Sequence, residues 1–181
     1  MNIIQTKFPD VMLLEPKIFE DERGFFLESY QQHRYQAAGI QLPFVQDNMS
    51  RSYKGVLRGL HFQKSNPQGK LITVTQGLVF DVVVNINPNS EHFGQHCSFE
   101  LSGDTQRQLW IPPGYAHGFY VLSDIAVFHY KCTAYYAPSD EAGIRWNDPQ
   151  LGIDWPIVSA PLLSEKDAKL PLWCDLVQSL S

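Results

Sequence analysis

Short β-forming runs separated by turn residues recur along residues 71–135, and this spacing limits the fold more than any other feature of the chain. The runs are rich in β-branched and aromatic residues, while the breaks contain Gly, Pro, Asn, Asp and Ser, which suit tight turns. The predicted strands are 71–75, 78–86, 96–101, 106–111, 117–122 and 125–135. Because no helical segments alternate with them, the sheets should be antiparallel, and the number of strands predicts an all-β, double-sheet jelly roll.

The flanking segments add further strands and a few short helices. Alternation broken by Pro9 and Pro16 indicates one or two edge strands within residues 1–19. A helical pattern covers residues 31–38, and Gly39 is placed to terminate it. The remaining predicted elements are a turn at 21–24, strands at 25–30, 44–52 and 56–63, loops at 146–149 and 154–156, and a short helix within 164–171.

The length suits one domain with a proper core, and we expect residues 1–181 to form a single domain. A composition of 44% hydrophobic and 18% charged residues, with no long apolar run, excludes a disordered chain and a membrane span. The net charge of −5 argues against a general nucleic-acid binder, so an anionic ligand would need a local cluster of Arg and Lys. Cys97, Cys132 and Cys174 form neither a disulfide framework nor a zinc ribbon pattern. The N-terminal residues lack the pattern of a signal peptide, which makes the cytoplasm the expected location.

Three separated stretches bring proton-handling or anion-binding groups toward a common interior. The stretches are 56–63, followed by 70–74, then 110–119 and 128–133. Their polar members are Arg58, His61, Lys70, His117 and Tyr130. A pocket built from strands would show its polar groups in this way, among β-branched and aromatic residues. The alternative is a set of structural side chains, since a single histidine in a strand is more often structural than catalytic.

The two-residue period of a strand decides which of these side chains can share a pocket. In residues 125–132 it places Tyr130 with the apolar residues that face the interior. There its hydroxyl requires a partner, supplied either by a pocket or by a backbone carbonyl. Strict alternation would send Arg58 and His61 to opposite faces, so both can enter one pocket only if Gly59 marks a bulge or a strong twist.

Histidines on the strands of a jelly roll make a metal site of the cupin type one alternative. Such sites usually combine a His-x-His pair, a Glu a few residues on and a third His after a Pro-x-Gly turn. Here Gln63 replaces the second His and no Glu follows before Gly69, so only His61 and His117 remain. Two imidazoles make a poor site for a divalent metal, which needs three or more ligands. The sequence therefore favours proton chemistry without a metal.

Two further sets of polar residues each allow two interpretations. Asp167 could orient His61 as a base, yet Ser164 three residues earlier also makes a helix capping box, which the spacing alone favours. Gln46 and Asn48 share a strand face and could hydrogen-bond a heterocycle or simply close a turn.

A series of motifs runs through nearly the whole chain: 21–26, 58–63, 70–72, 77–84, 112–119, 130–133 and 163–167. In sequence and in order they resemble the dTDP-4-dehydrorhamnose 3,5-epimerase family. The resemblance implies a cupin-type jelly roll that forms a homodimer, with the N-terminal strands exchanged across the dimer and the C-terminal tail packed on the barrel. It also implies epimerisation at C3 and C5 of a dTDP-4-keto-6-deoxy sugar, without a metal or a cofactor.

The resemblance assigns roles to four residues that would act on the sugar. His61 would be the base, and Asp167 would be its orienting carboxylate. Tyr130 would deliver a proton to the opposite face, and Lys70 would stabilise the enolate oxygen.

A larger set would hold the sugar, the diphosphate and the thymine. The substrate-binding residues implied by the resemblance are Arg23, Phe26, Glu28, Gln46, Asp47, Asn48, Arg58, Lys70, His117, Tyr136, Glu141 and Lys166. Tyr136 would stack on the base, and Phe26 would add apolar cover. Composition alone would make Arg23 a solvated turn charge and Glu28 a strand-end carboxylate, whereas in the family's dimer both would serve the neighbouring subunit's site.

One departure from the family pattern follows residues 77–84. An acidic and then a basic residue are common there, and this chain has Asn85 and Asn87. We interpret the change as one of loop or salt-bridge structure, since neither position is a proposed catalytic group. Relatives that epimerise only C3 or only C5, or that isomerise the ketone, would use the same His, Tyr and Lys. A sugar-nucleotide-binding protein without turnover is the alternative from another functional class.

Overall fold

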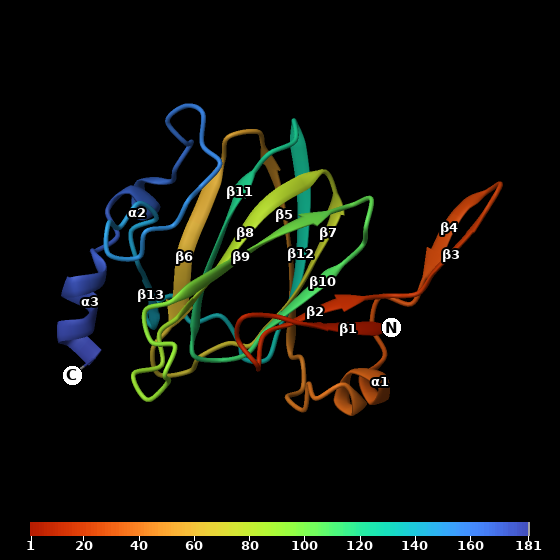
Figure 1. Ribbon diagram of the computed structural model, residues 1–181, viewed down its shortest axis with the longest axis horizontal. Helices are drawn as coiled ribbons and strands as arrows, with labels where there is room; N and C mark the ends of the chain where they lie inside the picture. The colour runs from red at the N-terminus through yellow and green to blue at the C-terminus, as the bar shows by residue number, and fades with distance from the viewer. Residues whose placement is uncertain (181) are drawn as a thin grey trace.

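A computed structural model describes residues 1–180, with side chains described as far as Gln178. Two antiparallel sheets face each other across the core (Figure 1). The six-stranded sheet has the order β1 (Asn2–Gln5), β2 (Met12–Glu15), β10 (Gln108–Ile111), β7 (Lys70–Gln76), β12 (Ile125–Cys132) and β5 (Gln46–Tyr53). The five-stranded sheet has the order β13 (Glu141–Gly143), β6 (Leu57–Gln63), β11 (Tyr115–Val121), β8 (Leu78–Asn85) and β9 (His96–Ser102). The predicted antiparallel double-sheet jelly roll is confirmed.

Apolar side chains of the two sheets meet in the space between them. Ile72 of β7 and Phe128 of β12 pack in one buried cluster with Val79 and Val83 of β8 and Phe119 of β11. Burying side chains of this size stabilises the fold by about 1.5–3 kcal/mol each. This cluster fixes the distance between the sheets, and so the shape of any cavity between them.

The outer face of the five-stranded sheet is covered by the C-terminal segment. Val84 packs in a second buried cluster with Leu151 and with Trp173 and Leu176 of α3 (Trp173–Leu180). Because β8 is covered on both faces, residues 79–84 form a nearly continuous apolar run instead of an alternating one.

One short helix covers part of the outer face of the six-stranded sheet. Tyr35 of α1 (Gln32–Ala37) packs with Trp110 of β10 in a third buried cluster. The Gln31 side chain caps the helix by accepting a hydrogen bond from the backbone N–H of Arg34 (2.7 Å). Gly39 takes a φ of +106°, which turns the chain away after the helix. The helix predicted over 31–38 is confirmed.

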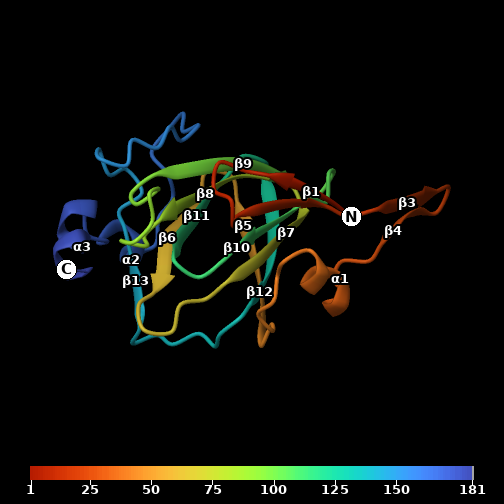
Figure 2. The ribbon, with the colours of Figure 1, turned by 60° about the horizontal axis from the view of Figure 1, so that its bottom comes forward.

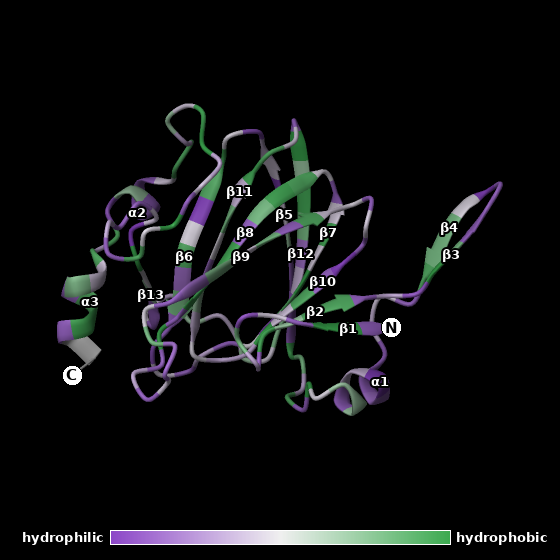
Figure 3. Cartoon of the chain, viewed as in Figure 1, coloured by the Kyte–Doolittle hydropathy of each residue, from purple (hydrophilic) through white to green (hydrophobic). Residues whose placement is uncertain are grey.

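A hairpin of β3 (Ile18–Asp21) and β4 (Gly24–Leu27) projects away from both sheets (Figures 1 and 2). Its aromatic residues Phe19, Phe25 and Phe26 are 52%, 57% and 70% exposed. Figure 3 shows hydrophobic residues on this hairpin as well as on the strands of the barrel. An exposed apolar surface of this kind is typical of a contact with another molecule.

The structure differs from the predicted elements mainly at their ends, with one exception near the N-terminus. Where one or two edge strands were predicted within residues 1–19, β1 and β2 form and β3 begins, and β2 lies between β1 and β10 instead of at an edge. Several strands are shorter than predicted: β4 stops at Leu27, β10 begins at Gln108 and β12 ends at Cys132. β10 begins late because Gln106 has a left-handed φ of +51°, which interrupts an extended strand. α2 (Glu165–Ala168) is also shorter than the predicted segment.

The sequence did not predict β13 or α3, and β13 is too short for a periodic signal. β13 has three residues and α3 has eight, and α3 follows directly after a proline-containing loop. None of the helices in residues 1–180 has the length and apolar character needed to cross a membrane.

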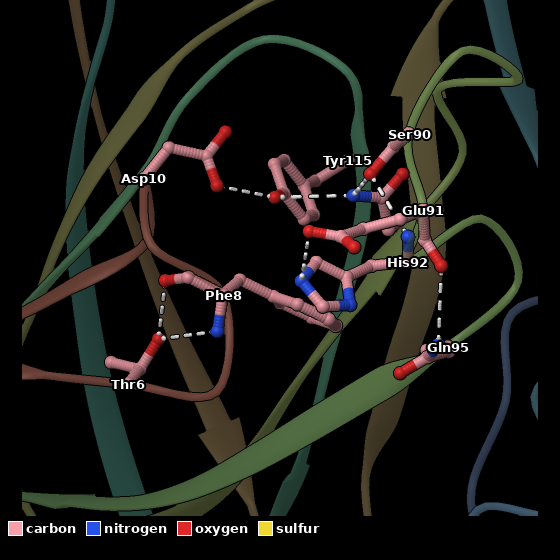
Figure 4. A network of polar contacts seen from close by, with 9 residues as sticks. Thr6, Phe8, Asp10, Ser90, Glu91, His92, Gln95 and Tyr115 are labelled. Atoms are coloured by element: carbon pink, nitrogen blue, oxygen red, sulfur yellow. Dashed lines mark hydrogen bonds and ion pairs between the residues drawn. The ribbon is translucent and has the colours of Figure 1, made fainter.

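A polar network fixes the loop that follows β8 (Figure 4). The Asn85 amide donates hydrogen bonds to Ser90 Oγ (3.1 Å) and to the Tyr115 hydroxyl (3.2 Å). The Tyr115 hydroxyl in turn donates to Asp10 Oδ1 (2.5 Å), and Ser90 Oγ accepts a hydrogen bond from the backbone N–H of His92 (3.1 Å). Asn85, one of the two asparagines that depart from the family pattern, is thus an uncharged link between a loop and the N-terminal segment.

Removing the carboxylate of Asp148 should destabilise the C-terminal segment. Asp148 is 3% exposed, and its carboxylate accepts hydrogen bonds from the backbone N–H groups of Gln150 (2.8 Å), Leu151 (3.1 Å) and Trp173 (2.7 Å). Asp148→Ala leaves three donors unpaired, so we expect the free energy of unfolding to fall by about 2–3 kcal/mol. The corresponding fall in Tm is roughly 5–10 °C by calorimetry. The exposed Asp154→Ala is the control, and equal Tm values for the two variants would contradict this role.

Candidate active site

A cavity of about 640 Å³ lies between the two sheets, a volume within the usual range for sites that bind small molecules. Side chains reach it from β5, β6, β7, β11 and β12 and from the C-terminal segment around α2. Its apolar lining includes Leu57, Phe119, Phe128 and Leu163. Its ionisable lining residues are Arg58, His61, Lys70, His117, Tyr130, Lys166 and Asp167.

A bulge in β6 lets Arg58 and His61 enter the same cavity. Two residues separate them on β6, whereas the matching segment of β11 contains only Gly118. Gly59 has a φ of +120°, and a Cβ atom there would lie 2.5 Å from Gly118 Cα, so no larger residue fits. Of the two conditions set by the sequence, a bulge or a strong twist at Gly59, the structure shows the bulge.

His61 and Asp167 form a close pair at one wall of the cavity. Nε2 of His61 lies 2.5 Å from Oδ1 of Asp167, which is 3% exposed. The backbone N–H of Asp167 also donates to Ser164 Oγ (3.0 Å), so the helix cap and the contact to His61 coexist. The predicted helix cap is confirmed, and the contact that an orienting role toward His61 requires is also present.

The protonation of this pair follows from its surroundings. Burial alone would raise the pKa of the Asp167 carboxyl, but the hydrogen bond and charge of His61, with Ser164 and Lys166, hold it below its usual value. An ionised carboxylate can only accept a hydrogen bond, so Nε2 of His61 carries the proton. Nδ1 of a neutral His61 then has a lone pair and can act as a base.

Tyr130 and Lys70 reach the cavity from the opposite sheet, as the two-residue period predicted for Tyr130. Burial raises the pKa of the Tyr130 hydroxyl, which therefore keeps its proton at neutral pH. Burial lowers the pKa of the Lys70 ammonium, while Cys132, Asp81 and Glu141 act in the other direction. Within residues 1–180, the Lys70 ammonium makes no hydrogen bond or ion pair.

His117 and Asp81 form a second, fully enclosed pair. Nε2 of His117 lies 2.8 Å from Oδ2 of Asp81, and the two residues are 7% and 0% exposed. Burial lowers the pKa of His117 and raises that of Asp81, and each partner opposes the shift of the other. The His117 ring also stacks on Phe128, with ring centroids 5.9 Å apart.

Lys166 connects the cavity to a polar cluster at its edge. Its Nζ lies 2.7 Å from Oε2 of Glu141, which also accepts a hydrogen bond from the Tyr136 hydroxyl (2.7 Å). The backbone N–H of Tyr136 donates to Gln46 Oε1 (2.9 Å), and the Gln46 amide donates to Asn48 Oδ1 (2.9 Å). Five residues that the resemblance assigns to substrate binding are thus contiguous.

Arg58 is held by a buried serine. Its Nε donates a hydrogen bond to Oγ of Ser52 (3.1 Å), which is 3% exposed. With Lys70 and Lys166, Arg58 makes the local cation cluster that an acidic protein needs to bind an anion.

Three of the implied binding residues lie on or beside the projecting hairpin, away from this cavity. Arg23 bonds to Asp21 in the hairpin turn (2.5 Å), and Glu28 pairs with Arg34 (3.1 Å). Phe26 is 70% exposed. The structure of one chain does not bring these residues to its own cavity.

Asp47 is also separate from the site. Its carboxylate accepts hydrogen bonds from Lys131 Nζ at 2.8 and 2.9 Å, and this ammonium lies over the ring of Tyr30 (5.1 Å). Alternation along β5 explains the difference, because Asp47 faces the other side from Gln46 and Asn48.

Sequence reasoning did not identify Asp81, Phe119 or Phe128 as parts of the site. The two phenylalanine rings stack with centroids 4.2 Å apart and planes inclined by 8°, forming an apolar part of the lining. A signal for Asp81 exists in the sequence, because a single acidic residue inside the apolar run 79–84 needs a partner when buried.

Within residues 1–180, no group of three or more His, Cys, Asp or Glu side chains is placed to hold a metal ion. His61 and His117, which suggested the metal alternative, are each paired with a carboxylate instead.

Comparison with known proteins places this site in a family. A sequence model described as dTDP-4-dehydrorhamnose 3,5-epimerase matches residues 5–175. The dTDP-4-dehydrorhamnose 3,5-epimerase of Salmonella typhimurium is 55% identical over 174 residues, 95% of each chain, and that of Pseudomonas aeruginosa is 52% identical over 97% of each chain. A crystal structure of dTDP-6-deoxy-D-glucose-3,5-epimerase from Legionella pneumophila, in complex with dTDP-4-keto-L-rhamnose, is 56% identical with a TM-score of 0.93. The match covers 94% of this chain and 92% of that one. The chain described here belongs to the dTDP-4-dehydrorhamnose 3,5-epimerase family.

Proposed function

We propose that this chain inverts C3 and C5 of dTDP-4-dehydro-6-deoxy-D-glucose, giving dTDP-4-dehydro-L-rhamnose. The observation that carries the proposal is the arrangement of one cavity between two sheets. The five-stranded sheet supplies His61, paired with Asp167, and the six-stranded sheet supplies Tyr130 and Lys70. A sugar ring between them would have a base on one face and an acid on the other, which inversion requires.

His61 is the base of the proposed reaction. C3 and C5 both flank the C4 ketone, so the proton on either carbon is acidified by the same carbonyl group. Nδ1 of His61 takes that proton, and the resulting imidazolium is stabilised by the carboxylate of Asp167. Proton exchange with solvent then regenerates the base.

Lys70 and Tyr130 complete the inversion. Loss of the proton places negative charge on the C4 oxygen, and the Lys70 ammonium stabilises this enolate in a cavity of low polarity. Tyr130 transfers its hydroxyl proton to the carbon from the opposite face, and the phenolate regains a proton from solvent. The same four groups serve both carbons once the ring has shifted.

The remaining polar residues suit the nucleotide part of the substrate. Arg58 and Lys166 provide positive charge for the diphosphate, with His117 at the cavity wall. Tyr136 is 48% exposed, so its ring can stack on thymine beside the amides of Gln46 and Asn48.

A second copy of the chain completes the site in our proposal. The projecting hairpin exposes Phe26 and the Arg23 side chain, and neither reaches the cavity of its own chain. A homodimer that exchanges the hairpins would bury Phe26 and bring Arg23 and Glu28 to the neighbouring site.

Mixed dimers can test this exchange. Arg23→Ala and His61→Ala homodimers should each be impaired, whereas their heterodimer should regain activity because one of its sites has both native residues. Activity is measured after co-expression with two affinity tags and purification of the doubly tagged species. If each hairpin instead contributes to the site of its own chain, every site in the heterodimer contains one substitution. The heterodimer would then be no more active than the Arg23→Ala parent, which would contradict the exchange.

The function itself is tested by proton NMR of the protein with dTDP-4-dehydro-6-deoxy-D-glucose in deuterated water containing a chelator. Deuterium should enter C3 and C5, and a downstream reductase should consume the L-configured product. Deuterium at one carbon alone would assign a single-site epimerase. Binding of dTDP without exchange would assign a binding protein, and activity that depends on added metal would contradict the metal-free mechanism.

A further inference from the structure

A buried carboxylate that the proposed mechanism does not use lies beside the cavity. Asp81 has no exposed surface, and its Oδ2 is paired with His117. Its Oδ1 is buried and has no hydrogen-bond partner within residues 1–180. Buried carboxylate oxygens without partners are costly and uncommon, so this atom calls for an explanation.

The direction of Asp81 follows from its neighbours on β8. Val79 and Val83, two residues before and after it, belong to the cluster between the sheets. The two-residue period therefore points Asp81 into the same interior. Its pairing with His117, which lines the cavity, confirms that direction.

In the described part of the chain, the Lys70 ammonium is a positive charge without a partner. Lys70 is the first residue of β7 in the opposite sheet, and it lines the same cavity. A charged Asp81 raises the pKa of the Lys70 ammonium, and a charged Lys70 opposes the rise that burial causes in the pKa of Asp81. The buried acceptor and the half-buried cation are thus within electrostatic reach of each other.

We propose that Asp81 is a positioning residue of this active site: Oδ2 fixes the ring of His117, and the carboxylate is the counter-charge that keeps the Lys70 ammonium protonated. The proposal rests on the proposed function, because it assigns to Asp81 the support of the group that stabilises the enolate. Lys70 must carry its proton to do so, and burial by itself favours the neutral amine.

Other titratable groups surround Lys70 and could affect its charge. Cys132 on β12 and Glu141 on β13 also favour its charged form, while His117 on β11, His61 on β6 and Tyr130 on β12 share the cavity. Glu141 is already bonded to Lys166 and Tyr136, and burial raises the pKa of the Cys132 thiol. Both of these Glu141 contacts use Oε2, so Glu141 keeps an oxygen as well, but among the described residues Oδ1 of Asp81 is the side-chain oxygen that is both buried and without a hydrogen-bond partner.

The test is the pH profile of Asp81→Asn. The amide keeps the size of the side chain and can still accept a hydrogen bond from His117, but it removes the charge. We expect the basic limb of kcat to move toward lower pH by about one unit, with kcat above that limb about tenfold lower and KM little changed.

A matched control separates charge from folding. Asp148→Asn alters another buried carboxylate, one that lies outside the cavity, and should leave the limb unmoved. A merely structural role for Asp81 would lower kcat in Asp81→Asn without moving the limb, which would overturn the proposal.

A second measurement does not depend on activity. Lysine labelled with ¹³C at Cε reports the titration of Lys70 by NMR, with its signal assigned as the one missing from Lys70→Arg. Asp81→Asn should lower the pKa of Lys70, and an unchanged titration would refute the proposal even if the substrate were a different one. Should the variant not fold, a Lys70 that is already neutral at pH 7 in the native protein would refute it equally. Failure of the native protein to exchange deuterium would instead count against the proposed function.

Discussion

His61→Ala is expected to lower kcat for deuterium incorporation at C3 and C5 by about 10²–10⁴-fold. The substitution removes the imidazole whose Nε2 lies 2.5 Å from Oδ1 of Asp167, and with it the lone pair on Nδ1 that acts as the base. Substrate binding should change much less, because the cations near the diphosphate remain in place. The measurement is proton NMR in deuterated water at saturating substrate, with dTDP affinity determined in parallel.

Two companion variants make this result specific. Asp167→Asn presents an amide N–H or a weaker acceptor to His61, so the imidazole loses the tautomer in which Nδ1 is the base, and exchange should also fall. His33→Asn changes an exposed histidine on α1 and should behave as the native protein. Normal exchange in His61→Ala would show that another group removes the proton.

The sequence predicted the barrel well because its strands have strong local signals. Residues 78–86 form a long apolar run, and the structure explains it, since β8 is covered by the other sheet on one side and by the C-terminal segment on the other. The C-terminal segment was harder to predict from the sequence. α3 is held by Trp173 and Leu176 against a face of the sheet that no local pattern identifies.

The site also divides into features that a local sequence pattern predicts and features that it does not. The period of β12 was enough to point Tyr130 inward. Gly59 marked the place where a bulge or a strong twist would admit both Arg58 and His61, and the structure has the bulge. The contact between His61 and Asp167 joins residues 106 positions apart, so spacing could not choose between a cap and a catalytic pair. Asp81 was overlooked because a lone carboxylate in an apolar run indicates a partner without saying which one.

Tyr130→Phe is expected to separate proton removal from inversion. The variant keeps the ring, which packs against Phe128 with centroids 5.9 Å apart, and loses only the hydroxyl. His61 should still remove the proton and return a deuteron to the same face. Recovered substrate should therefore contain deuterium at unchanged configuration, while formation of the L-configured product falls by about 10²-fold or more.

The informative quantity is the ratio of deuterium in recovered substrate to product formed, because it reports the two faces of the sugar separately. A general loss of packing would lower both the deuterium in recovered substrate and the amount of product, whereas loss of the acid alone raises the ratio of the two. Tyr135→Phe, which alters an exposed tyrosine, should leave the ratio unchanged. If Tyr130→Phe still formed product at the native rate, the proton would have to come from water or another residue on the six-stranded sheet. His61 would then keep its role while the acid would need reassignment, because base and acid lie on different sheets and can fail independently.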